Sequence, residues 1–480
     1  MILVWLLLLN GLFLLPSLAL PGDTPWFSLE ALIVWALICG LRKPEQKYRV
    51  GQILAVLYGL LVLLVLADAL VRESLGRGLN LYLELGLLDA AWNLLDTNLG
   101  AGLAVLALII LAALLAGVGR LFRYGLERLA QHSPARLGKP LWLVSGLFLA
   151  GAVTPWIGSP ALAFVANQAS LITHTHKTTR NFAKELNAGP GRQSQPSPLA
   201  KLAQTDVILG FIESYGVSTV TDERYRSLVG PGLEAMGQSL DAAGLTVATG
   251  RLQSPIQGGQ SWLGHLSVLS GQWIHNQLAY ETLLSSGYAT LIDDFRSTGH
   301  KTLAVMPAIT QAWPEGRLFR YDRIYDHDDL DYQGPPFNWV TMPDQYTWHR
   351  FQAIRDSHQG PLFAELALIS SHAPWVPILP VLDDWQSIGN GEVFQRWKGA
   401  GEAPALMIIL GDHQPAPLIT GEDASRDVIV HVVSADPKLV EPFLSGELPG
   451  FRPGIRPDPE TPGATMSRFR PFLHRHFGQP

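Results

Sequence analysis

Four polar residues that can bind a cation or move a proton follow short apolar runs in the second half of the sequence. The run VILGFI leads directly to Glu213, and the run LMIIL leads through a glycine to Asp412 and His413. A third run, ELALIS, is followed by Ser371 and His372. Carboxylate oxygen and imidazole nitrogen together suit a hard or borderline divalent cation with one position open for substrate.

Each of these residues also has an ordinary structural interpretation. Glu213 is then a helix-capping acid, the GDHQP segment is a turn stopped by proline, and His372 is a loop histidine whose polar atoms are satisfied. Polar residues nevertheless follow three predicted strands of one sheet. Their joint occurrence favours a metal site over three unrelated structural roles.

A candidate nucleophile lies in the segment GGQSWLGHLS. The paired glycines Gly258 and Gly259 let the backbone approach a ligand, and a helix that starts after them offers free N–H groups to an anion. Coordination of the Ser261 hydroxyl to a cation would lower its pKa and turn it toward a phosphorus atom. On local sequence alone, Ser261 is equally well the N-cap of that helix.

The elements that must position these residues form an α/β pattern. From Asp206 onward, short apolar runs alternate with stretches of helical period such as residues 280–297. This alternation predicts a mostly parallel sheet flanked by helices, in which ligands collect at the carboxyl ends of the strands.

The first third of the chain has a different character. Its apolar stretches are each near the roughly 17–25 residues that span a bilayer, and they lie at residues 2–20, 26–41, 50–71, 101–118 and 141–157. The first stretch has no charged leading region, so we interpret it as an uncleaved helix. The segment 79–99 mixes leucine with acidic residues, which is typical of an interfacial amphipathic helix.

Loop charges predict the orientation of a five-span anchor. Arginine and lysine gather at residues 42–49 and 120–139, which places both loops in the cytoplasm. The N-terminus is then inside, and everything after Trp156 lies outside. We therefore divide the chain into a transmembrane anchor (1–160), a polar linker (161–204) and an α/β domain (205–480).

Overall composition excludes two classes of site. The net charge of −6 comes with no basic stripe, so nucleic acid is not an expected partner. The single cysteine, Cys39, allows no intrachain disulfide and no cysteine-based metal site.

The motifs FIESYG, GGQSWLGHLSVLSG, SSHAPW and ILGDHQPAPLIT, in this order, resemble one branch of the alkaline phosphatase (sulfatase) superfamily. That branch contains the lipoteichoic acid synthases and the phosphoglycerol and phosphoethanolamine transferases, and the resemblance covers about residues 205–475. It implies an alkaline-phosphatase-like fold in which Glu213, Asp412 and His413 bind a divalent metal, and Ser261 is both metal ligand and nucleophile. His372 matches the family histidine that contacts the transferred group or the leaving oxygen.

The resemblance also implies an activity. A phospholipid head group of the phosphoglycerol or phosphoethanolamine type would pass through a phospho-serine to a glycan, a lipid or water, with one Mn, Zn or Mg ion as cofactor. The expected partners are membrane lipid, a phospholipid head-group donor and a cell-envelope glycan acceptor. The expected location is a bacterial-type inner membrane, multi-pass, with the C-terminal domain periplasmic or extracellular.

Tryptophan is frequent in the C-terminal part and is a candidate for stacking against sugar rings, although core packing is its commoner use. Trp375 follows His372 in SSHAPW, and we assign both to substrate binding. The other candidates are Trp262, Trp339, Trp348 and Trp385.

Three alternatives remain open on the sequence. A sulfatase would need a Pro-x-Arg context after Ser261, and Trp262, Leu263 and Gly264 stand there instead. The segment 385–405 is short and glycine-rich where relatives carry a helix, which also allows a degenerate protein that binds lipid or glycan without catalysis. A transporter is disfavoured because the spans carry almost no charge except near their ends.

Overall fold

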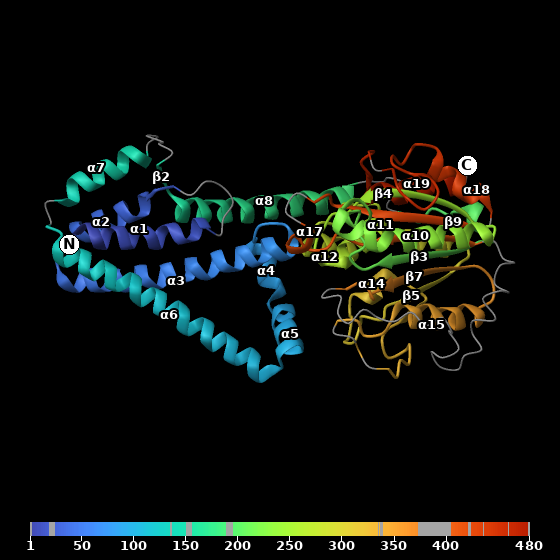
Figure 1. Ribbon diagram of the computed structural model, residues 1–480, viewed down its shortest axis with the longest axis horizontal. Coiled ribbons are helices and arrows are strands. Elements are labelled where there is room, and N and C mark those ends of the chain that lie inside the picture. Colours follow the sequence, from blue (N-terminus) through green and yellow to red (C-terminus); the bar gives the residue numbers. More distant parts are fainter. Residues whose placement is uncertain are drawn as a thin grey trace. The chain divides into compact units, whose positions relative to one another are not determined.

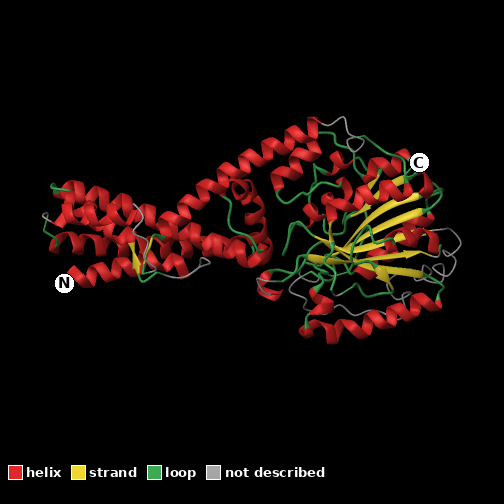
Figure 2. Ribbon diagram, turned by 90° about the horizontal axis from the view of Figure 1, so that it is seen from above, coloured by secondary structure: helices red, strands yellow, loops and turns green. Residues whose placement is uncertain are grey.

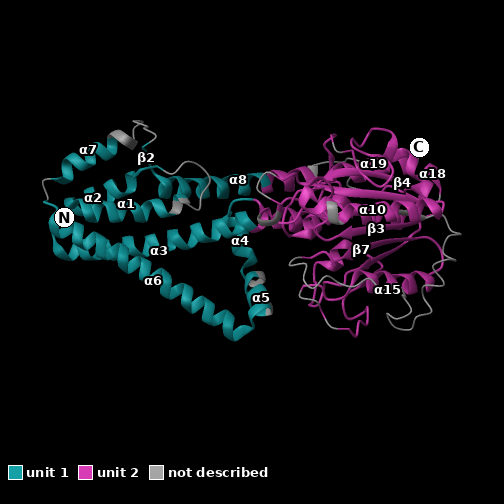
Figure 3. Cartoon of the chain, in the orientation of Figure 1, with its two compact units in different colours: residues 1–73, 77–178 teal, residues 74–76, 179–480 magenta. Residues whose placement is uncertain are grey.

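The computed structural model describes the chain except for residues 1, 19–24, 135–136, 150–155, 189–194, 335, 337–338, 373–404, 421–423, 435, 459 and 479–480. The chain forms two compact units (Figure 3). Unit 1 comprises Met1–Glu73 and Arg77–Thr178, and unit 2 comprises Ser74–Gly76 and Thr179–Pro480.

Unit 1 is helical, with one short parallel strand pair, β1 with β2 (Figure 1). Its elements are α1 (Ile2–Leu18), β1 (Phe27–Ser28), α2 (Leu29–Gly40), α3 (Pro44–Leu75), α4 (Leu81–Glu84), α5 (Leu88–Leu99), α6 (Ala101–His132), α7 (Gly138–Leu149), β2 (Ile157–Gly158) and the start of α8 (Pro160–Ala188).

Among the described residues of unit 1, two helices are long and apolar enough to cross a membrane. These are α3 and α6, with 32 residues each, and they contain the predicted spans 50–71 and 101–118. The first two predicted spans correspond to shorter apolar helices, Ile2–Leu15 and Leu29–Gly40. The count of five spans is not confirmed, and part of the fifth lies outside the described residues.

An apolar and aromatic core holds these helices together. Tyr58 of α3 stacks on Phe122 of α6 with ring centroids 4.4 Å apart, and Phe13 of α1 meets both rings edge-on. The acidic residues buried in this unit have partners: Asp68 pairs with Arg72 at 2.7 Å, and Glu30 accepts a hydrogen bond from Ser28 at 2.6 Å.

The range 161–204, predicted as a polar linker, begins with the 29-residue helix α8. From Thr173 onward this helix is mostly polar, and the glycine- and proline-rich stretch after it led to the interpretation as a linker. Residues 205–480 contain the sheet of unit 2, as the α/β pattern predicts.

Unit 2 is built on a sheet with helices on both sides (Figure 2). Its described strands are β3 (Asp206–Ile212), β4 (Thr246–Gln253), β5 (Lys301–Val305), β6 (Arg323–Tyr325), β7 (Leu362–Leu368), β8 (Ala405–Gly411), β9 (Asp427–Ser434), β10 (Arg452–Pro453) and β11 (Ala464–Thr465). Its described α-helices are α9 (Ser218–Thr221), α10 (Glu223–Ala242), α11 (Ser261–Ser270), α12 (Gln277–Ser285), α13 (Leu291–Ser297), α14 (Gly316–Phe319), α15 (Asp344–Asp356), α17 (Pro417–Thr420), α18 (Pro437–Val440) and α19 (Phe469–Phe477).

The prediction of a mostly parallel sheet is not confirmed, because the sheet is mixed. Among the described strands the order is β10-β4-β9-β8-β3-β7-β5-β6, with β11 beside β4. The strands from β8 to β6 are parallel, whereas β9 runs antiparallel to both β8 and β4, and β10 is antiparallel to β4. An apolar run signals burial but not direction, so the sequence pattern could not reveal this reversal.

Strand β3 shows why the core divides into two layers. Successive side chains of a strand point to opposite faces, and Val207, Leu209 and Phe211 join one apolar cluster while Ile208 joins another. The first cluster includes side chains of α11, α13 and α19, and the second includes those of α15. Burial on both faces explains the continuous apolar run of β3.

Candidate metal and nucleophile site

The register of three parallel strands brings the predicted site residues to one level. Ile212 at the end of β3 pairs with Leu368 of β7 on one side and with Gly411 of β8 on the other. The residues that follow these partners therefore leave the sheet together. Glu213 follows Ile212, and Asp412 with His413 follows Gly411.

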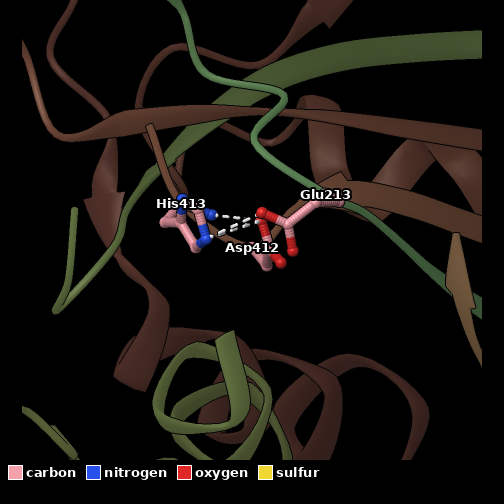
Figure 4. Close-up of side chains that lie close together, drawn as sticks. All are labelled: Glu213, Asp412 and His413. Carbon is pink, nitrogen blue, oxygen red and sulfur yellow. Dashed lines mark hydrogen bonds and ion pairs between the residues drawn. The ribbon is translucent and has the colours of Figure 1, made fainter. Parts of the chain in front are cut away.

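Glu213, Asp412 and His413 form a cluster whose ligand atoms all lie within 4.8 Å of one another (Figure 4). Asp412 and His413 are 2% and 1% exposed. Nε2 of His413 lies 3.0 Å from Oε1 of Glu213 and 3.9 Å from Oδ1 of Asp412. The sequence prediction thus placed three potential ligands that the fold does bring together.

The ring of His413 is oriented as a metal ligand would be. Its Nδ1 lies 2.8 Å from the backbone carbonyl oxygen of Gln414, so this nitrogen carries a proton. Nε2 is buried and makes no hydrogen bond of acceptable geometry, despite its proximity to Glu213. A neutral imidazole would face the carboxylates with a lone pair, an arrangement that a cation between them stabilises. The residues present therefore fit a divalent ion.

The pKa shifts of the three side chains indicate that the buried carboxylates favour a positive charge beside them. Burial lowers the pKa of His413, but the charges of Asp412 and Glu213 outweigh it and raise the pKa to about 10. Burial and the Glu213 charge raise the pKa of Asp412 to about 6. Burial opposes ionisation of Glu213, yet His413 and His372 hold its pKa below the usual range.

The hydroxyl of Ser261 points at this cluster. Ser261 is the first residue of α11, and its Oγ donates a hydrogen bond of 3.0 Å to Oε2 of Glu213. The N-cap is Gln260, which makes no side-chain cap, so Ser261 does not have the capping role that local sequence allowed. The start of a helix favours an anion bound beside this hydroxyl.

Backbone strain adjoins both parts of the site. Among the described residues, the non-glycine positions with positive φ are Ser214, Gln260, Arg320 and Asp331. Ser214 follows Glu213, and its backbone N–H and hydroxyl bond to Asp412 and Glu213 at 3.0 and 2.7 Å. Gln260, at φ 62°, precedes Ser261. Such conformations persist only where surrounding contacts enforce them, and they concentrate at functional sites.

His372 lies on a loop that is tied to Glu213. The hydroxyl of Ser371 donates to the backbone oxygen of Glu213 at 2.5 Å, and the N–H of Glu213 donates to Leu368 at 2.8 Å. The charge of His372 also contributes to the lowered pKa of Glu213. The other predicted substrate-binding residue, Trp375, lies outside the described residues.

Asp344 anchors the same loop and was missed at the sequence level. Its Oδ1 accepts hydrogen bonds from the backbone N–H groups of Ile369 at 2.6 Å and Ser370 at 2.9 Å. Its own N–H donates to the Ser370 hydroxyl at 2.7 Å. Loss of water around this carboxylate raises its pKa to about 6, although these bonds oppose the rise. The sequence signal was an aspartate at the first turn of a helix after a proline, which is too common to single out.

A second group that the sequence prediction missed is the contact between His265 of α11 and Glu365 of β7. His265 is one helical turn after Ser261, stacks on Phe211 at 3.8 Å, and places Nδ1 2.8 Å from Oε1 of Glu365. The other carboxylate oxygen of Glu365 accepts a hydrogen bond from the hydroxyl of Tyr321. The available signal was Glu365 itself, a charge in the middle of the apolar strand β7. This pair fixes the face of α11 that carries Ser261.

Comparisons with known proteins return solved structures but no sequence relatives. No protein-family model matches the chain, and no curated protein matches it. The lipooligosaccharide phosphoethanolamine transferase EptA from Neisseria meningitidis is 12% identical with a TM-score of 0.41, over 79% of this chain and 77% of that one. The phosphoglycerol transferase GacH from Streptococcus pyogenes is 13% identical with a TM-score of 0.35, over 54% and 73%. The lipoteichoic acid synthase LtaP from Listeria monocytogenes is 12% identical with a TM-score of 0.35, over 53% and 71%.

These proteins come from the groups that the sequence motifs resemble. At such identities and scores, the functional argument rests on the site itself.

Proposed function

We propose that this chain is a membrane-anchored, metal-dependent phosphotransferase in which Ser261 is the nucleophile. The observation that carries the proposal is the convergence of a buried imidazole nitrogen, two carboxylates and a serine hydroxyl at one end of the sheet. A divalent ion held by Glu213, Asp412, His413 and Ser261 would act as a Lewis acid toward the phosphoryl oxygens.

The protein groups then divide the work of the first step. Ser261 Oγ forms a bond to the phosphorus of a phosphodiester, and its proton leaves along the hydrogen bond toward Glu213. The bond from phosphorus to the leaving oxygen breaks, and a proton from His372 neutralises that oxygen. The N-terminus of α11 stabilises the transferred anion. In the second step an acceptor hydroxyl gives its proton to His372 and forms the new bond to phosphorus, while the bond from phosphorus to Ser261 Oγ breaks and Ser261 regains its proton from Glu213.

The donor follows from the anchor. Helices α3 and α6 are long and apolar enough to hold the chain in a bilayer, and the charge of the loops favours a location of unit 2 outside the cytoplasm. A phospholipid of the outer leaflet, with a phosphoglycerol or phosphoethanolamine head group, is the donor that such a chain meets there.

The test is a covalent one. Full-length protein in detergent, loaded with Mn, Zn or Mg, is incubated with phosphatidylglycerol or phosphatidylethanolamine, and the peptide containing Ser261 is analysed by mass spectrometry. We expect the mass of a phosphorylated head group on Ser261, and none in Ser261→Ala. Ser261→Thr retains a hydroxyl and should retain part of the labelling. A metal-loaded wild type that never becomes labelled with either lipid would overturn the proposal in favour of a non-catalytic binding protein.

A further inference from the structure

Three of the candidate tryptophans lie in different environments. Trp348 packs edge-on against Phe351 in the core at 6.0 Å, and Trp339 lies 5.9 Å from the ring of His372. Trp262, in contrast, is 40% exposed. Core packing, the commoner use of tryptophan, therefore does not explain Trp262.

Trp262 is exposed but held in one orientation. Its indole Nε1 donates a hydrogen bond of 2.9 Å to Oε1 of Gln277, the first residue of α12. Nε2 of Gln277 donates in turn to Oε1 of Glu281 at 3.0 Å. A single exposed apolar side chain is ordinary on a protein surface. The indole of Trp262 differs because its N–H is hydrogen-bonded to Gln277, which is itself hydrogen-bonded to Glu281. The ring face therefore points in a defined direction.

The location of this ring ties it to the site. Trp262 follows Ser261 in α11, so the two Cα atoms are about 3.8 Å apart. The contact of His265 with Glu365 also holds helix α11 against strand β7. A ligand resting on the indole would therefore lie at the same end of α11 as the nucleophilic hydroxyl.

The chemistry around the ring suits a sugar. A pyranose combines an apolar C–H face, which packs on an aromatic ring, with hydroxyl groups at its edge, which need hydrogen-bond partners. The indole supplies the face, and the amide of Gln277 and the carboxylate of Glu281 supply partners at the edge. An ammonium head group is also attracted to an indole face, so the binding experiment tests that alternative directly.

We propose that Trp262, Gln277 and Glu281 form a subsite for a sugar ring of the acceptor, a proposal that rests on the transfer activity of Ser261. In the second step a hydroxyl of this sugar forms the new bond to phosphorus. The bond from phosphorus to Ser261 Oγ breaks, Ser261 regains its proton from Glu213, and the proton of the sugar hydroxyl goes to His372.

The experiment separates the two half-reactions in the full-length, metal-loaded protein. Labelling of Ser261 by phospholipid measures the first step, and loss of the label to a panel of glucose and N-acetylglucosamine disaccharides measures the second. In Trp262→Ala, labelling should stay within about twofold, while the KM for the disaccharide should rise roughly tenfold or more, as expected for loss of an aromatic anchor. Trp262→Phe keeps a ring face and should recover most of the affinity. Met236→Ala, at a residue 39% exposed on α10, is the matched control and should change neither step.

Direct binding keeps this proposal distinct from the proposed activity. Saturation-transfer NMR should detect the disaccharides on wild type and not on Trp262→Ala, even if wild type never labels at Ser261. If wild type binds the disaccharides but Ser261 is never labelled, the result contradicts the transferase activity and leaves the sugar subsite intact. Equal binding and transfer by wild type and Trp262→Ala would overturn the sugar subsite. A Trp262-dependent response to ethanolamine or choline without one to disaccharides would also overturn it, in favour of a head-group cation.

Discussion

The hydroxyl of Ser261 and the carboxylate of Glu213 are joined by a hydrogen bond of 3.0 Å, although 48 residues separate them in the chain. One residue starts a helix and the other ends a strand. Their contact links the anion-binding end of α11 to the candidate cation site. It is the relationship on which the proposed chemistry depends.

Removal of one metal ligand should abolish metal binding at ordinary concentrations. His413→Ala and Asp412→Ala each delete a ligand from a small set, and the loss should exceed the roughly 10–100-fold that outer partners of a metal site typically cost. Metal content after equilibrium dialysis, measured by plasma mass spectrometry, checks this. His431→Ala, at a buried histidine bonded to Thr249, is the control and should retain the metal. Wild-type stoichiometry in both ligand variants would move the site elsewhere.

Metal binding should release about one proton at pH 8. The folded-state pKa of His413 is raised from 6.5 to about 10. The stability that its proton contributes is therefore fully present below pH 6.5 and is lost as the pH rises through about 10. A cation that binds Nε2 at pH 8 must displace this proton. Calorimetric titrations in HEPES and Tris, which differ in ionisation enthalpy, measure the release, and the absence of any buffer dependence would contradict the assignment.

His372→Ala should slow transfer without removing the metal. A residue that protonates the leaving oxygen contributes about 10²- to 10⁴-fold to the rate, and His372 is not among the clustered ligands. The rate of Ser261 labelling and the metal content, measured on the same preparation, check the two expectations. Loss of both together would instead make His372 a ligand or a structural residue.

Asp344 should act through the loop that carries His372. Asp344→Ala leaves the N–H groups of Ile369 and Ser370 without their acceptor, and an unsatisfied buried donor costs about 1–3 kcal/mol. Asp344→Asn keeps an oxygen in place and should restore much of the stability and rate. Chemical denaturation gives the free energy of unfolding, and the pH profile of labelling reports the position of His372. An alanine variant with the wild-type profile would show that Asp344 only stabilises the fold.

The orientation of the chain is open to a direct measurement. Positive charge at residues 42–49 and 120–139 predicts that unit 2 lies outside the cytoplasm. Alkaline phosphatase fused after Thr178, the end of unit 1, should be active, and a green fluorescent reporter at the same point should be dark. The opposite pattern would place unit 2 in the cytoplasm and remove the outer-leaflet donor from the proposal.

The sequence determined the parts of this protein that local pattern encodes. Apolar runs identified β3, β7 and β8, and the polar residues after them gave Glu213, His372, Asp412 and His413. Paired glycines before a helical pattern gave Ser261. The long apolar helices α3 and α6 followed from composition, because a run of some twenty apolar residues has few other uses.

Tertiary structure alone decided what depends on contacts between distant residues. The antiparallel course of β9 follows from its connections, and an apolar run carries no direction. Asp344 meets its loop across 25 residues, and His265 meets Glu365 across 100. Trp262 differs from Trp348 only in what surrounds it, since one side chain meets water and the other a packed core. Local sequence specifies which groups are available, while register and packing determine which of them meet.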